Sequence, residues 1–87
     1  MDTMAQQISE LESVVTSLNE IQEDITVPRN VRTQIQIIMT SLRAETEQSI
    51  KINKALNELD EISSDVNLQS YTRTQIWNIM SVLEKLH

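Results

Sequence analysis

Apolar residues recur along the chain at spacings of three and four, which is the period of one face of an α-helix. The first stripe predicts a helix over about residues 3–24 and consists of Ile8, Leu11, Val14, Val15, Leu18 and Ile21. Proline has no backbone N–H and disfavours helix in the residue before it, so Pro28 separates this helix from the next. We expect Thr26 or Val27 to cap a second helix that holds Pro28 in its first turn and runs to about Arg43. Its stripe is Val31, Ile35, Ile38, Met39 and Leu42.

The break between the second and third helices is inferred from the direction of their stripes, because neither Gly nor another Pro follows Pro28 before Ser63. At about 100° per residue, the apolar positions of residues 47–63 centre roughly 100° away from the second stripe. One straight helix could not bury both stripes against one partner. We therefore place a break near residues 44–46, with Thr46 as the N-cap of a third helix over about 47–63. Its stripe is Ile52, Ala55, Leu56, Leu59 and Ile62.

A polar connection over residues 64–69 precedes a fourth helix, for which Ser70 is the expected cap. The connection contains two apolar residues, Val66 and Leu68, and we expect both side chains to plug the core. The stripe of the fourth helix is Ile76, Ile79, Met80, Leu83 and Leu86.

The chain contains an internal sequence repeat. Residues 32–42 and 73–83, 41 positions apart, are identical at seven of eleven positions. Leu18-Asn19-Glu20 recurs as Leu56-Asn57-Glu58 at an offset of 38, so the second connection is expected to be three residues longer. The prediction is one all-α domain over residues 1–87, a four-helix up-and-down bundle of two similar hairpins over about 3–43 and 46–86. The alternative is a fragment of a HEAT-like solenoid, although such arrays usually need three or more units.

Three segments resemble, in order and spacing, the archaeal uncharacterised protein family 0147. They are Thr26-Val27-Pro28-Arg29-Asn30-Val31-Arg32, Leu59-Asp60-Glu61-Ile62-Ser63-Ser64-Asp65 and Thr72-Arg73-Thr74-Gln75-Ile76-Trp77. The resemblance covers nearly the whole chain and implies a small intracellular helical bundle with bromodomain-like topology and no assigned activity. Members of the family tend to carry prolines between the second and third helices and after the position of Asp65. This chain has none in either place.

Composition excludes most catalytic chemistry. The 87 residues include no Cys and no Gly, so disulfides, thiol nucleophiles, zinc knuckles, iron–sulfur clusters and glycine-rich phosphate loops are absent. The single histidine, His87, is terminal, which leaves no internal imidazole for a general base or for a carboxylate di-metal site. We expect a protein without catalysis, cofactor, metal ion or small-molecule substrate.

The charge balance points to a protein partner. Seven basic and thirteen acidic residues give a net charge of −6, which opposes general binding to nucleic acid. The chain holds no run of about 20 apolar residues that could span a bilayer, so we expect a cytoplasmic protein without membrane contact. The expected function is a small protein–protein interaction module or accessory subunit, acting by docking or self-association. The alternative is a ribonucleoprotein accessory factor in which Arg29, Arg32 and Arg73 contact RNA phosphates.

Charged residues are expected to gather at one end of the bundle, because both hairpin turns lie there. The acids are Glu20, Glu23, Asp24, Glu58, Glu61 and Asp65, and the arginines are Arg29, Arg32 and Arg73. One interpretation is a solvated network whose exposed ion pairs contribute roughly 0–1 kcal/mol each. The other is a docking surface for a charged partner, recognised by complementary charge.

Trp77 and Ile37 are further interface candidates. Each lies more than about 120° from the core direction of its helix, so each could be exposed. Tryptophan is enriched in binding hot spots because it buries a large rigid surface at low entropic cost. The alternative for Trp77 is burial at the edge of a helix face that touches two neighbours.

Overall fold

The computed structural model describes residues 3–86, and side chains from residue 9 onward. Its helices are α1 (Thr3–Glu23), α2 (Arg29–Arg43), α3 (Gln48–Ser63) and α4 (Ser70–Leu86). The four predicted helices are therefore confirmed. The expected core position of Ile8 lies outside the described side chains.

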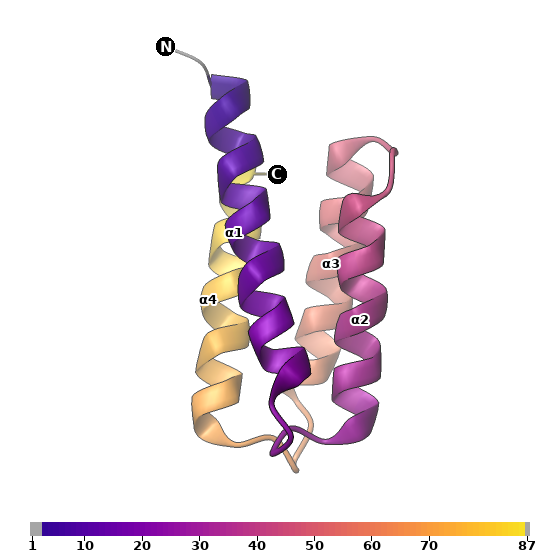
Figure 1. Ribbon diagram of the computed structural model, residues 1–87, viewed down its shortest axis with the longest axis vertical. Coiled ribbons are helices and arrows are strands. Elements are labelled where there is room, and N and C mark those ends of the chain that lie inside the picture. Colours follow the sequence, from indigo (N-terminus) through magenta and orange to yellow (C-terminus); the bar gives the residue numbers. More distant parts are fainter. Residues whose placement is uncertain (1–2, 87) are drawn as a thin grey trace.

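The helices form a closed up-and-down bundle in which each packs against two neighbours. Helices α1 and α3 both contact α2 and α4, so α2 and α4 occupy opposite corners. Both hairpin turns lie at one end of the bundle, at the bottom of Figure 1, and the α2–α3 connection lies at the other end. The bundle measures 42 × 21 × 19 Å, and the predicted four-helix bundle is confirmed in place of the solenoid alternative.

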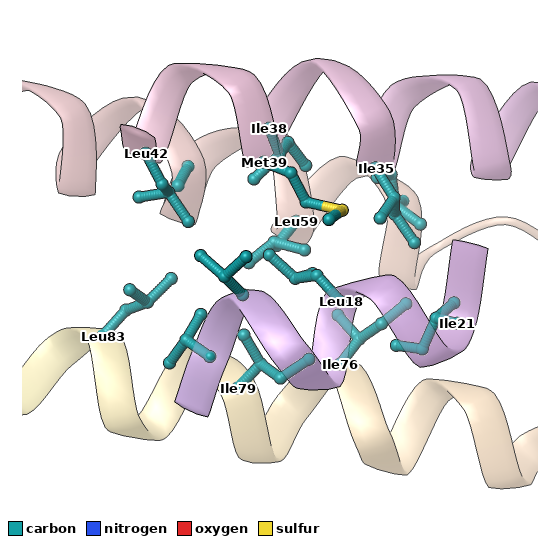
Figure 2. Packing of buried hydrophobic residues seen from close by; sticks show 14 of the residues in the cluster. Leu18, Ile21, Ile35, Ile38, Met39, Leu42, Leu59, Ile76, Ile79 and Leu83 are labelled. Atoms are coloured by element: carbon teal, nitrogen blue, oxygen red, sulfur yellow. The ribbon is translucent and has the colours of Figure 1, made fainter. Parts of the chain in front are cut away.

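One apolar core runs along the bundle and receives side chains from all four helices (Figure 2). The stripe residues at its centre are fully buried, namely Leu18, Ile21, Ile35, Ile38, Leu42, Ile52, Leu59, Ile76 and Leu83. Three residues that the stripes placed in the core, Leu11, Leu56 and Met80, are only partly buried and pack against its margin. Burial of this stripe, at about 25 cal/mol per Å² of apolar surface, is the main force that holds the helices together.

The start of α2 differs from the expectation. Pro28 is the N-cap residue itself, with φ −55° and ψ 143°, and the helix begins at Arg29. Neither Thr26 nor Val27 caps the helix, because the chain turns from extended to helical only after Pro28. The Thr26 hydroxyl instead donates a hydrogen bond to Asp24 Oδ1 at 2.6 Å.

The starts of α3 and α4 are also one residue away from the predicted caps. The N-cap of α3 is Glu47, with ψ 132°, in place of Thr46, and no side-chain hydrogen bond closes this end. Ser70 is the first residue of α4, and Arg73 N–H donates to the Gln69 carbonyl oxygen at 3.0 Å. In each case the cap position follows the backbone dihedral angles, which residue preference alone does not fix.

The two connections within the hairpins keep one register, so the expectation of a connection three residues longer is wrong. Leu59, 41 residues after Leu18, is like Leu18 fully buried, whereas Leu56 is only partly buried. The match at an offset of 38 misleads because three residues are close to one helical turn, which leaves similar residues on nearly the same face.

Candidate functional site

The two hairpin turns are built alike. Val27 N–H donates to the Asp24 carbonyl oxygen at 3.1 Å, and Leu68 N–H donates to the Asp65 carbonyl oxygen at 3.1 Å. These are β-turns that begin at aspartate. In each turn the aspartate side chain also accepts from the backbone two residues later, at 2.9 Å from Thr26 N–H and 2.8 Å from Asn67 N–H. Such bonds fix the turn without glycine, which the chain lacks.

The carboxylate of Asp24 is stabilised in its charged form. The Thr26 hydroxyl is the main cause of a lowered pKa for Asp24, and the Thr26 backbone N–H and the positive charge of Arg32 lower the pKa further. The first turn therefore carries a full negative charge at neutral pH.

An apolar residue is almost fully exposed at the tip of each turn. The exposed fraction is 85% for Ile25 and 91% for Val66, both at the second turn position. The fourth position points inward, so Val27 and Leu68 are 3% and 5% exposed. The expectation that Leu68 plugs the core is correct, and the expectation that Val66 does so is wrong. The second position of a β-turn lies at the bend, where its side chain is directed away from the helices.

A hydrogen bond connects the two hairpins at this end. Asn30 Nδ2, in the first turn of α2, donates to Asp65 Oδ2 of the second hairpin turn at 3.4 Å. Beside it lies a hollow of about 230 Å³ between α2 and α3, lined by Asn30, Val31, Gln34, Glu61, Ile62 and Asp65. Two carboxylates therefore face a recess next to the Val66 tip.

The three arginines have different environments. Arg73 Nε donates to the Ser63 carbonyl oxygen at 2.8 Å, and Arg73 Nη2 donates to the carbonyl oxygens of Asp65 at 2.9 Å and Leu68 at 3.4 Å. Arg73 thus closes the C-terminal end of α3. Arg32 is partly buried, and its Nε finds no acceptor among the described residues. Arg29 is exposed.

The acids outnumber the arginines at this end by six to three. Glu20, Glu23 and Glu61 are exposed, whereas the two turn aspartates are partly covered. The Arg73 guanidinium, which donates to carbonyl oxygens, is directed into the fold. We call this region the turn-end surface and define it by Ile25, Val66 and the acids Glu20, Glu23, Asp24, Glu61 and Asp65.

Trp77 and Ile37 lie away from this surface. Trp77 in α4 is 53% exposed and Ile37 in α2 is 46% exposed. Burial of Trp77 at the edge of its helix is therefore not observed. Because α2 and α4 do not contact each other, the two residues do not form one patch.

Ile25, Ile50 and Tyr71 are further exposed apolar residues that the helical stripes do not single out. A signal for Ile25 was present, because Asp24-Ile25-Thr26-Val27 and Asp65-Val66-Asn67-Leu68 share one pattern of acidic, apolar, polar and apolar residues. Two such turns, 41 residues apart, predict two exposed tips.

Metal binding and membrane crossing find no support in the described part of the chain. Among residues 3–86, no group of three or more acidic or histidine side chains is arranged to hold a metal ion. Over the same residues, every helix is too short or too polar to cross a lipid bilayer.

Comparisons with known proteins identify the family. The profile of the uncharacterised protein family UPF0147 matches residues 1–86. The crystal structure of a UPF0147 protein from Thermoplasma acidophilum is 34% identical, covers 93% of this chain and 96% of its own, and has a TM-score of 0.88. The crystal structure of MMP1188, a Methanococcus protein of unknown function, is 41% identical, covers 88% of this chain and 89% of its own, and has a TM-score of 0.83. A comparison with curated proteins found no match. The chain belongs to UPF0147, as the sequence resemblance predicted.

Proposed function

We propose that this member of UPF0147 is a small, non-catalytic interaction module that docks through its turn-end surface onto a basic protein. The observation that carries the proposal is the exposure of Ile25 and Val66, at 85% and 91%, at the same end of the bundle. We place the protein in the cytoplasm, because a chain without cysteine needs no oxidising compartment.

The two tips supply apolar contact area. Turn positions of this kind are usually occupied by polar residues or by Pro and Gly, which suit the turn backbone. Two β-branched residues placed there expose apolar surface that contributes nothing to the core. Exposed apolar side chains with a polar rim are typical of protein-binding sites.

The acids specify the sign of the partner. Glu20, Glu23 and Glu61 are exposed around the tips, and the hollow beside Val66 presents Glu61 and Asp65 together. The positive head group of a lysine or arginine complements the charge of this acidic recess, whereas an acidic partner is repelled. The proposed partner therefore presents apolar side chains between Lys or Arg residues.

The alternative of RNA binding has less support. It requires Arg29, Arg32 and Arg73 to reach phosphates, yet Arg73 donates to three carbonyl oxygens of its own hairpin. Arg29 is then the exposed arginine of the three, in a chain whose net charge of −6 opposes phosphate binding.

The proposal is tested with a defined probe, the capped peptide Lys-Lys-Leu-Lys-Lys, titrated into isotope-labelled protein and followed by backbone amide NMR shifts. We expect shifts confined to both turns and their flanking helix ends. Removing the tips in the double variant Ile25→Ser/Val66→Ser should weaken peptide binding at least about tenfold, equivalent to about 1.4 kcal/mol.

The matched control is Ile50→Ser, which removes a 60% exposed isoleucine from α3, near the α2–α3 connection and away from the turns. This variant should bind the peptide as the unchanged protein does, and thermal melts should show that all variants fold. The peptide Glu-Glu-Leu-Glu-Glu should produce no shifts. Equal binding of both peptides, or shifts elsewhere on the bundle, overturns the proposal. Salt-dependent binding of total RNA that is lost in Arg29→Gln would favour the alternative.

A further inference from the structure

The turn-end surface consists of two halves whose residues correspond at an offset of 41, except that Glu23 corresponds to Ser64. Ile25 corresponds to Val66, and the buried residues that follow, Val27 and Leu68, correspond as well. Their hydrogen bonds agree within 0.1 Å in the β-turn and in the aspartate side-chain bond. The backbone bond that opens the next helix also recurs, from Arg32 N–H to the Pro28 oxygen and from Arg73 N–H to the Gln69 oxygen, at 3.0 Å each.

The acids around the tips follow the same correspondence. Glu20 and Asp24 precede Ile25 at the same spacing at which Glu61 and Asp65 precede Val66. Glu20 lines a hollow between α1 and α4 together with Gln75, and Glu61 lines the hollow between α2 and α3 together with the equivalent Gln34. Each tip is therefore preceded by its own pair of carboxylates. Only Glu61 and Asp65 line one hollow together, because the hollow at Glu20 extends along α1 and α4 and does not include Asp24.

Helix packing relates the two halves by rotation about the long axis of the bundle. The interface of α1 with α4 corresponds to that of α3 with α2, and both pairs are in contact. A half-turn about this axis exchanges the two hairpins, whose turns both lie at the same end of the bundle (Figure 1). The Asn30–Asp65 hydrogen bond, at 3.4 Å, connects the two halves.

We propose that the partner of the turn-end surface is a homodimer that docks with its two-fold axis along the bundle axis. Each of its subunits places one apolar side chain flanked by Lys or Arg on one tip. A two-fold partner can make the same contact twice only where the surface repeats by the same rotation, and this surface does. This inference rests on the proposed docking function.

A second copy of this chain does not fit the surface. Two turn-end surfaces facing each other would bring five carboxylates of each copy together against three arginines, of which Arg73 is engaged in its own hairpin. Like charges across an interface oppose association. The charge of the halves therefore selects a basic dimer.

Titration with the Lys-Lys-Leu-Lys-Lys peptide counts the half-sites and distinguishes one from the other. We expect two peptides to bind per chain, with separate NMR shifts around Ile25 and around Val66. Val66→Ser should remove binding at the second turn and leave the affinity at the first turn unchanged, and Ile25→Ser should do the converse. Calorimetry gives the stoichiometry independently of the shifts.

A tandem peptide represents the dimeric partner. Two copies joined by about 12 Gly and Ser residues span roughly 19 Å on average, which suits a bundle cross-section of 21 × 19 Å. The tandem should bind about 10²- to 10⁴-fold more tightly than the single peptide, because the second contact becomes intramolecular. The control is a tandem with one copy replaced by Glu-Glu-Leu-Glu-Glu, which should bind only as the single peptide does.

The outcomes separate the two proposals. One peptide bound per chain, or a tandem no tighter than its control, overturns the dimeric partner and leaves the docking function standing. Absence of any peptide shift at the turns overturns both.

Discussion

Arg73 and Arg32 stand at equivalent positions 41 residues apart and are used differently. Arg73 donates to three backbone carbonyl oxygens around the end of α3, whereas the buried Nε of Arg32 has no acceptor among the described residues. The two arginines begin segments that are identical at seven of eleven positions, yet among the described residues Arg73 alone of the two is seen to donate to carbonyl oxygens at the end of the preceding helix. The difference affects stability, because a charged donor on otherwise orphaned carbonyls is among the stronger hydrogen bonds in a protein.

Replacement of Arg73 should therefore cost more than replacement of Arg32. Arg73→Ala is expected to lower the free energy of unfolding by about 2 kcal/mol, since it strips a partly buried cap from the end of α3. Arg32→Ala serves as the matched control and should cost less than half as much. Urea unfolding followed by circular dichroism measures both, and equal losses would show that the Arg73 bonds add nothing.

The register of the two hairpins can be tested in the core. Leu59 is fully buried and corresponds to Leu18, while Leu56 lies at the margin. Leu59→Ala should destabilise the fold by about 3 kcal/mol, and Leu18→Ala by a similar amount. Leu56→Ala should cost about 1 kcal/mol, because part of its side chain is already in water. A larger loss for Leu56 than for Leu59 would contradict the packing described above.

The exposure of Trp77 predicts its spectroscopy. An indole with 53% of its surface exposed should emit at long wavelength and be quenched readily by acrylamide in a dilute sample of the monomer. Trp77→Ala should lower the free energy of unfolding by about 1 kcal/mol, well under the 3 kcal/mol or more usual for a buried tryptophan. Blue-shifted emission with poor quencher access in that sample would contradict the exposure of Trp77.

The turn at Asp24 makes part of the stability depend on pH. The pKa of Asp24 in the folded chain lies below its ordinary value of 3.8, mainly because of the Thr26 hydroxyl. A carboxyl group with a lowered folded-state pKa stabilises the fold above its ordinary pKa. That contribution disappears as the pH falls from about 4 through the lowered value.

Thr26→Val removes the hydroxyl and keeps the shape and the backbone N–H of the residue. The Asp24 pKa, followed by NMR of its carboxyl carbon, should rise toward the ordinary value in this variant. Thr33→Val, at an exposed position of α2, is the control and should leave the Asp24 pKa unchanged. The same Asp24 pKa in the Thr26 variant as in the unchanged chain would rule out the hydroxyl as the main cause.

The helices and most of the core could be predicted from the sequence, because helical period and burial are both local properties of a stripe. Val31, Ile35, Ile38, Met39 and Leu42 all lie at the predicted spacing and are all buried. Pro28 fixes the first break through its own backbone chemistry. The family resemblance was likewise visible in the order of three short segments.

Only the tertiary structure decided the residues at the margins. Whether Trp77 and Leu56 are buried depends on how wide a face the neighbouring helices cover, which no angle within one helix determines. The internal repeat could be recognised in the sequence. The register between its two copies could be assigned only from the packing, because a shift of three residues nearly restores the same helix face.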